Sequence, residues 1–155
     1  MGKLVGCITD VCSHALGVEA FPEEDKDETK IYPLIVKDSP LPCSEEDTFS
    51  TRHDNQTSIC FPVYEMEARS REEILDPDLG RKIGEVVIKD LPAGRPKGQP
   101  SEVTFDLDAS FCRHVTAIDM KTGKKVEADF DIRSGLDEEK KARTTKMLDG
   151  AVIQS

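Results

Sequence analysis

The chain has 155 residues, with 21 lysines and arginines against 31 aspartates and glutamates, which gives a formal net charge of −10 and a pI of about 4.8. This length is typical of a single domain. The negative balance repels phosphate groups and anionic lipid, and two tyrosines and six phenylalanines supply few rings for stacking on single-stranded nucleic acid. We therefore expect no binding to nucleic acid and none to membrane surfaces.

The apolar stretches and the cysteines indicate a cellular compartment. No apolar stretch approaches the roughly 20 residues of a membrane helix, and the N-terminus lacks the apolar region of a signal peptide. Five cysteines, an odd number, occur without a Cys-x-x-Cys spacing. Reduced thiols are the simplest interpretation, and they predict a cytoplasmic location.

Two-residue alternation of apolar and polar side chains predicts eight β-strands. In the sixth, Val103, Phe105 and Leu107 share one face and acidic or hydroxyl side chains share the other. Such alternation gives each strand one dry and one wet face, which is typical of antiparallel sheets. The fold class predicted is all-β, a two-sheet antiparallel sandwich. The expected strands span residues 15–21, 29–36, 48–52, 57–64, 83–88, 101–108, 113–119 and 125–132.

Two segments depart from simple alternation: the strands that contain proline, and the end of the chain. Pro33 and Pro62 lie inside strand-like runs, so we expect those strands at sheet edges or at bulges. Ser134 can cap a helix whose first turn is acidic, and Gly150 can end it. A short C-terminal helix from about 137 to 148 is expected, although its apolar stripe is poor.

Candidate catalytic groups are scattered. The histidines His14, His53 and His114 fall in three different segments, and His114 reads as a half-buried or solvent-facing side chain of a strand. Cys12 and His14 match no strong zinc spacing, and no phosphate-binding glycine motif is present. We therefore expect no enzymatic activity and no cofactor in this chain. A hydrolase that uses His53 or His114 with a nearby cysteine is supported only by the presence of these residue types.

Four blocks of sequence carry a more specific signal. They are Leu16-Gly17-Val18-Glu19, the Phe-Ser-Thr-x-x-Asp-Asn-Gln-Thr pattern at 49–57, the Glu-Val-Thr-Phe-Asp run within 100–109, and Ser134-Gly135-Leu136. Together and in this order they resemble the C-terminal substrate-binding domain of the 70-kDa heat-shock (DnaK-like) chaperones. The resemblance runs from about residue 10 to residue 140. It implies a remnant of an interdomain linker at 1–14, a peptide-binding β-sandwich at 15–133, and a truncated lid helix and tail at 134–155.

The resemblance implies a chaperone of the stress response that holds extended hydrophobic segments of unfolded proteins in a channel between loops. ATP would bind a separate nucleotide-binding domain, and co-chaperones would be further partners. Val18, Phe49, Ile59 and Phe61 would line a pocket for one aliphatic side chain. Phe21 and Arg52 would arch over the bound backbone, and Ser50 and Gln56 would hydrogen-bond it. Ala20, Thr51 and Ser101 complete the implied peptide-binding residues, and Asp54 and Lys97 match a latch under the lid.

Several residues depart from the family pattern. Arg52 stands where relatives often have a small or aromatic residue, which would loosen the arch or repel basic side chains, and Ser101 falls near an apolar channel residue of the family. The acidic loop 22–30 would favour peptides with flanking Lys or Arg. An open channel could also capture the tail of a neighbouring chain, and residues 151–153 are the apolar candidate. The alternative function is a β-sandwich interaction module that has lost the channel and binds one folded partner.

Overall fold

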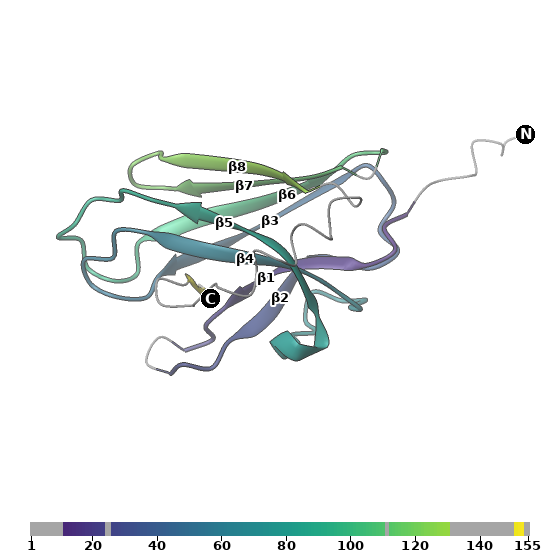
Figure 1. Cartoon of the computed structure of the whole chain (residues 1–155), viewed down its shortest axis with the longest axis horizontal. Coiled ribbons are helices and arrows are strands. Elements are labelled where there is room, and N and C mark those ends of the chain that lie inside the picture. The colour runs from purple at the N-terminus through teal and green to yellow at the C-terminus, as the bar shows by residue number, and fades with distance from the viewer. Residues whose placement is uncertain (1–10, 24–25, 111, 131–150, 154–155) are drawn as a thin grey trace, which may run out of the picture.

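The computed structural model describes residues 11–23, 26–110, 112–130 and 151–153 as two stacked antiparallel sheets (Figure 1). One sheet has the strand order β2-β1-β4-β5, and the other has the order β8-β7-β6-β3-β9. A short 3-10 helix, Pro77–Leu79, precedes β5. The strands are β1 (Ala15–Ala20), β2 (Lys30–Ile35), β3 (Cys43–Thr51), β4 (Ile59–Met66), β5 (Arg81–Ile88), β6 (Pro100–Leu107), β7 (Arg113–Asp119), β8 (Lys125–Phe130) and β9 (Ala151–Ile153).

The all-β sandwich expected from the alternation is confirmed, and each of the eight expected runs corresponds to a strand. β3 begins five residues earlier than expected, at Cys43, and β9 was not expected as a strand at all. The helix expected at 137–148, and the linker expected at 1–14 except for residues 11–14, lie outside the described residues.

The core lies between the two sheets and follows the alternation. In β6, Val103, Phe105 and Leu107 are buried, while the residues between them are partly or fully exposed. From the facing sheet, Phe61 meets Phe49 edge to face, with the ring centroids 5.7 Å apart. Burying each such aromatic or aliphatic side chain contributes about 1.5–3 kcal/mol, which makes this face the main stabilising element.

The two prolines sit where a missing N–H is tolerated. Pro33 lies in β2, an edge strand, beside a register shift between Leu16 and Gly17, as expected. Pro62 lies in β4, which is an interior strand, so an edge position is wrong for it. The pairing of β4 with β1 covers residues 63–66 and so does not include Pro62, and the register of β4 with β5 shifts between Val63 and Tyr64. The bulge and the shortened ladder accommodate Pro62.

One end of the sandwich is closed by a buried ion pair between the sheets. Glu65 of β4 accepts hydrogen bonds from Arg113 of β7 at 2.7 Å and from Arg81 at 3.0 Å. Burial alone would raise the pKa of Glu65, but the two guanidinium groups outweigh it and lower the pKa. Gly84 lies above the ring of Phe130, where a Cβ would fall 2.2 Å from a ring carbon. The ion pair and this ring occupy one end of the sandwich, and the loops after β1, β3 and β5 lie at the other end.

Candidate functional site

Three loops meet at the end of the sandwich opposite Glu65, after β1, β3 and β5. The loop after β3 is held by Gln56, whose Oε1 accepts the N–H groups of Arg52 at 2.8 Å and His53 at 3.0 Å. Gln56 Nε2 donates to the carbonyl of Ser58 at 2.8 Å, and Asn55 takes a left-handed conformation with φ 61°. These contacts order the loop itself, so binding of a peptide backbone by Gln56 stays a prediction.

The four residues expected to line a pocket all lie in the core between the sheets, where the rings of Phe49 and Phe61 are in contact. Val18 of β1, Phe49 of β3, and Ile59 and Phe61 of β4 belong to one core cluster, and each is 0 % exposed. The open slot expected from the sequence is therefore closed to solvent in this structure. We call these four residues the slot.

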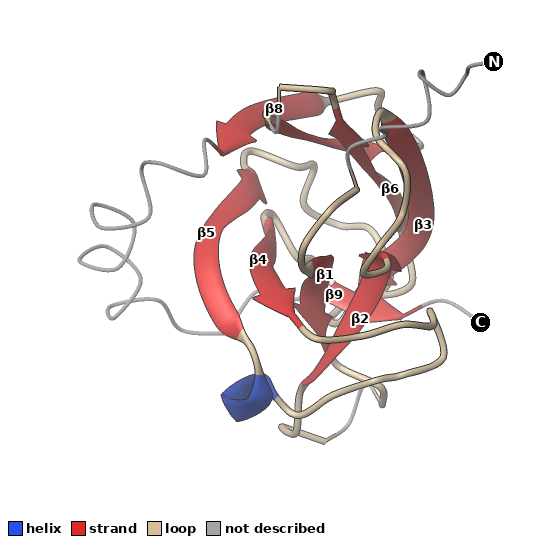
Figure 2. Cartoon of the chain, turned by 90° about the vertical axis from the view of Figure 1, so that its right-hand side faces the viewer, coloured by secondary structure: helices blue, strands red, loops and turns tan. Residues whose placement is uncertain are grey.

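A segment of the chain itself lies beside the slot. β9 pairs antiparallel with the end of β3, with Phe49 opposite Ile153, Ser50 opposite Val152 and Thr51 opposite Ala151. The N–H of Phe21, directly after β1, donates to the carbonyl of Ala151 at 2.8 Å. Ala151 is 0 % exposed and belongs to the same core cluster as the slot. β9 thus joins the ends of β1 and β3, as Figure 2 shows.

The two residues expected to form an arch are in contact. The guanidinium carbon of Arg52 lies 3.7 Å from the centre of the Phe21 ring, a cation–π geometry. Arg52 Nη2 donates to the carbonyl of Lys26 at 2.8 Å and to Asp27 Oδ1 at 2.7 Å. Arg52 is only 7 % exposed, so the loose arch expected from its length and charge is wrong. The arginine is held because the loop after β1 supplies both a carbonyl and a carboxylate.

The remaining expected site residues lie in the strands around the slot. Ala20, Ser50, Thr51 and Ser101 are all buried. The N–H of Thr51 donates to the carbonyl of Gln99 at 3.0 Å, toward the β6 side. Because main-chain groups alternate in direction along a strand, those of Ser50 face β9. Ser101 stands opposite Phe49 in the register of β3 with β6, and its hydroxyl finds no hydrogen-bond partner among the described residues.

The expected latch residues join two loops. An Asp54 carboxylate oxygen accepts the N–H of Lys97 at 2.9 Å, which links the loop after β3 to the loop after β5. A residue that sequence reasoning missed strengthens this region: Arg95 donates two hydrogen bonds to the carboxylate of Asp119, at 3.1 and 3.2 Å. A contact of this latch with a lid stays a prediction, because the expected lid lies outside the described residues.

The acidic loop after β1 is internally neutralised to a large extent. Glu23 pairs with Lys26 at 3.3 Å, and Glu28 pairs with Lys30 at 3.1 Å. Asp27 pairs with Arg52 at 2.7 Å. Each described acidic side chain between 22 and 30 therefore has a cationic partner, which reduces the field that this loop can offer a ligand.

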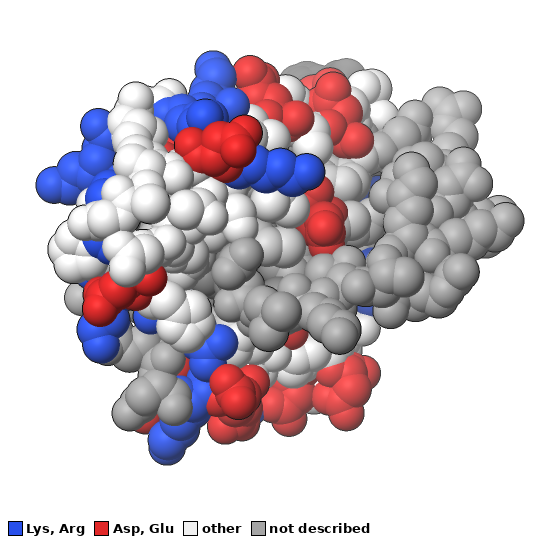
Figure 3. All heavy atoms as spheres, turned by 60° about the vertical axis from the view of Figure 1, so that its left-hand side comes forward, with Lys and Arg blue, Asp and Glu red and all other residues white. Residues whose placement is uncertain are grey.

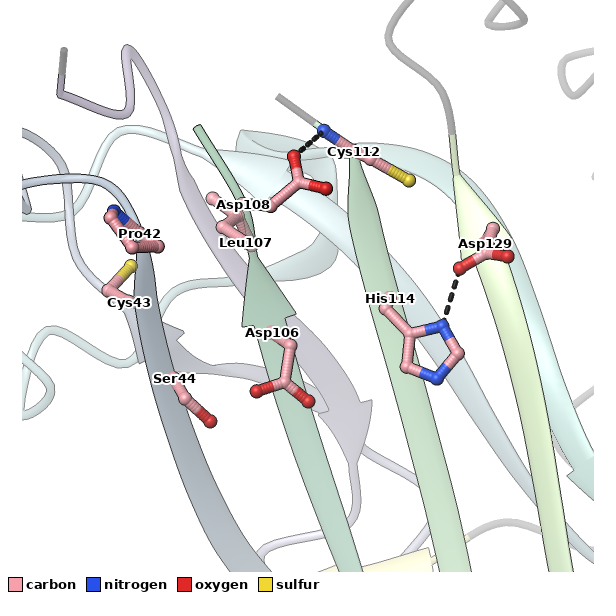
Figure 4. Close-up of a pocket in the computed structure, with 9 residues that line it drawn as sticks. All are labelled: Pro42, Cys43, Ser44, Asp106, Leu107, Asp108, Cys112, His114 and Asp129. Carbon is pink, nitrogen blue, oxygen red and sulfur yellow. Dashed lines mark hydrogen bonds and ion pairs between the residues drawn. The ribbon is translucent and has the colours of Figure 1, made fainter. Parts of the chain in front are cut away.

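A hollow on the outer face of the second sheet is a second candidate site (Figure 4). It is lined by Pro42, Cys43, Ser44, Asp106, Leu107, Asp108, Cys112, His114 and Asp129. His114 Nδ1 contacts Asp129 at 2.5 Å and Nε2 contacts Glu127 at 2.8 Å, and these hydrogen bonds, chiefly that to Asp129, raise the pKa of His114. Burial, with smaller effects from neighbouring groups, raises the pKa of the Cys43 thiol. Both pKa shifts favour the protonated forms, which weakens His114 as a base and Cys43 as a nucleophile, and β6 lies between the strands that carry them.

The candidate metal ligands do not converge. Cys12 Sγ donates to the carbonyl of Val36 at 3.0 Å, and His14 Nδ1 faces Glu67 at 2.7 Å. In the described ranges, no three His, Cys, Asp or Glu side chains lie together in a way that could hold a metal ion. No helix of these same ranges is long and apolar enough to cross a membrane.

Comparison with known proteins identifies the family to which this sandwich belongs. The family model described as Hsp70 protein matches residues 6–151. The match extends over both sheets and includes the slot, the arch and the start of β9. The chain belongs to the Hsp70 family.

Proposed function

We propose that this chain is a peptide-holding domain of the Hsp70 family, the part that grips extended aliphatic segments of unfolded proteins. The bound segment would lie along residues 49–51 of β3, with one side chain directed to the slot and the arch of Phe21 and Arg52 above it. Nucleotide binding would belong to a separate domain that controls this one, with co-chaperones as further partners.

The observation that carries the proposal is the position of β9. An extended backbone already lies along the end of β3, and the Phe21 N–H donates to its first carbonyl. Main-chain pairing of this kind accepts almost any sequence, while a pocket for alternate side chains supplies selectivity. The slot residues Val18, Phe49, Ile59 and Phe61 are all apolar, so an aliphatic side chain is the ligand that suits them.

The arch explains how such a ligand would be retained. A peptide added to a strand edge is open to water on one side and exchanges quickly. The contact of Arg52 with Phe21 and Asp27 covers that side with a buried guanidinium. We expect release of the peptide to require opening of this arch.

Titration of a labelled Leu-centred heptapeptide into the purified chain tests the proposal. The wild type should bind it saturably, and Ile59→Phe should abolish binding because the larger side chain fills the slot. Overpacking of a core costs about 1–3 kcal/mol, so Ile83→Phe, at a buried position of β5 away from the slot, is the matched control for stability. The control should keep peptide affinity at a similar loss of stability.

Two results would contradict the proposal. Equal affinity of wild type and Ile59→Phe would show that the peptide binds elsewhere. A peptide array with no signal for any hydrophobic sequence would favour the alternative, an interaction module for a folded partner, which is supported by the closure of the slot to solvent.

A further inference from the structure

We infer that β9 is an internal ligand of the slot: the chain's own segment Ala151–Ile153 occupies the peptide position and competes with external peptides. This inference rests on the proposed function and adds a regulatory contact to it. It differs from the capture of a neighbour's tail, because here the segment and the slot belong to one chain.

The contacts of β9 are those expected of a ligand. Among the described residues it pairs along β3 as the last strand of the order β8-β7-β6-β3-β9, and on its other side it accepts one hydrogen bond, from the Phe21 N–H. It contacts β1 and β4 as well as β3, the three strands that carry the slot residues. The Phe21 N–H that bonds Ala151 belongs to one half of the arch. Each of these groups would be available to a peptide if β9 left.

The chemistry of the segment also fits the slot. Ala-Val-Ile is a run of three aliphatic residues in a chain that is 34 % charged. Ala151 is fully buried in the core cluster that contains Val18, Phe49, Ile59 and Phe61. Aliphatic side chains on an extended backbone are the ligand class already proposed for this slot.

A short tether makes a weak internal ligand effective. Residues 131–150 connect β8 to β9, so the segment and the slot belong to one molecule. Linking a ligand to its site within one chain gives an effective concentration on the order of millimolar. If the free segment binds with a Kd of about 0.1 mM, the slot is occupied about ten times as often as it is empty, and external peptides bind about tenfold more weakly.

Peptide titration with a series of chain ends tests the inference. A chain ending at Gly150 should bind the labelled heptapeptide about tenfold more tightly than the full chain. A chain ending at Ile153 retains β9, and as the matched control it should bind like the full chain. Ala151→Asp in the full chain places a charge where Ala151 is 0 % exposed, and this substitution should expel the segment and raise affinity by a similar factor without truncation.

Hydrogen exchange of the Phe21 amide supplies a second measurement. This N–H should lose protection in the chain ending at Gly150 and in Ala151→Asp, and it should regain protection when peptide saturates the slot. Far-UV circular dichroism and thermal unfolding should show both variants folded, since the two sheets do not depend on an edge strand of three residues.

The opposing outcomes are distinct. Equal affinity in all four chains, with binding intact, would overturn the internal ligand and leave the proposed function standing. Failure of every chain to bind peptide would reject the proposed function, and the inference with it. Occlusion that grows with protein concentration, together with a dimer in solution, would assign the segment to a second copy and overturn the intramolecular form. Unfolding of both variants would also overturn it, because β9 would then be a structural strand.

Discussion

Two buried polar side chains stand opposite each other on β6 and β7, and they differ in the hydrogen bonds that their polar atoms form. Ser101 and Asp119 are register partners, and both are 0 % exposed. Asp119 accepts hydrogen bonds from Arg95 and from the N–H and hydroxyl of Thr122. The Ser101 hydroxyl finds no partner within the described part of the chain. The hydrogen bonds of Asp119 offset the free-energy cost of burying its carboxylate, whereas burial of the Ser101 hydroxyl lowers the stability of the fold.

Ser101→Ala should therefore raise the free energy of unfolding by about 1 kcal/mol. An unsatisfied buried hydroxyl costs about 1–3 kcal/mol, and the small cavity left by its removal offsets part of that stabilisation. Urea unfolding of the variant and the wild type at pH 7 measures the difference. Ser50→Ala, at a buried position one strand away, is a suitable control for a general serine effect. A less stable Ser101→Ala would contradict this reading, because it would show that the hydroxyl forms a stabilising hydrogen bond.

Asp119→Asn should lower stability at pH 7 by about 3 kcal/mol, since it removes one partner of a buried ion pair. Burial alone would raise the pKa of Asp119, but hydrogen bonds from Arg95 and Thr122 outweigh it and lower the pKa. A lowered native pKa contributes stability that is complete above about pH 4, the ordinary range of aspartate, and is lost as the pH falls through the native pKa.

The measurement is urea unfolding between pH 7 and pH 2.5. The wild type should lose more stability in the acid range than Asp119→Asn, whose amide does not titrate. Parallel pH profiles for the two proteins would contradict the role assigned to the Arg95 and Asp119 pair.

At the scale of elements, β3 is one strand with two kinds of edge. Residues 44–46 are exposed, and the glutamates among them keep this half from pairing with another chain. Residues 49–51 are buried, and their free side pairs with β9. The second half is therefore the part of the sheet that is able to accept an added strand, whether β9 or a peptide.

Loosening of the arch should speed peptide release. Asp27→Asn removes the charge that holds Arg52 over Phe21, and because Asp27 is 98 % exposed the effect should be modest, about two- to fivefold in the dissociation rate. Glu28→Gln is the matched control, since Glu28 pairs with Lys30 instead. Stopped-flow displacement of a prebound labelled peptide measures the rate in both variants. Identical dissociation rates in the two variants would show that Asp27 does not help to retain the peptide.

At the scale of the whole molecule, the chain carries a formal net charge of −10. Basic and acidic side chains both occur on the face drawn in Figure 3. The described acidic residues near the arch are paired with Lys26, Lys30 and Arg52. A ligand at the arch would therefore meet a weaker negative field than the composition suggests, although the overall charge still attracts cations at low salt.

Peptides with flanking lysines should bind more tightly than their glutamate-flanked counterparts, by about two- to threefold in Kd at low salt. The difference should arise mainly in the association rate and should disappear at about 0.5 M salt, where exposed charges are screened within a few ångströms. Fluorescence titration of one Leu-centred peptide with either flank measures it. Equal affinities at low salt would exclude a role for the acidic loop in selectivity.

The sequence alone determined the sheets. Alternation at eight runs placed eight strands, because the division of each strand into dry and wet faces is a local property of its residues. Local sequence missed the first half of β3, where Cys43-Ser44-Glu45-Glu46-Asp47 shows no apolar face, since an exposed edge strand needs none. The family resemblance also named Phe21 and Arg52 as a pair, and the structure brings them into contact.

Only the tertiary structure decided what lies at the slot. β9 has three residues, too few for a periodic pattern, and it forms a strand only because the end of β3 offers unpaired main-chain groups. Likewise, Asp27 and Arg95 became functional candidates through partners distant in sequence, Arg52 and Asp119. Strand formation depends on neighbours along the chain, whereas occupancy of a site depends on which distant groups the fold brings within hydrogen-bond reach.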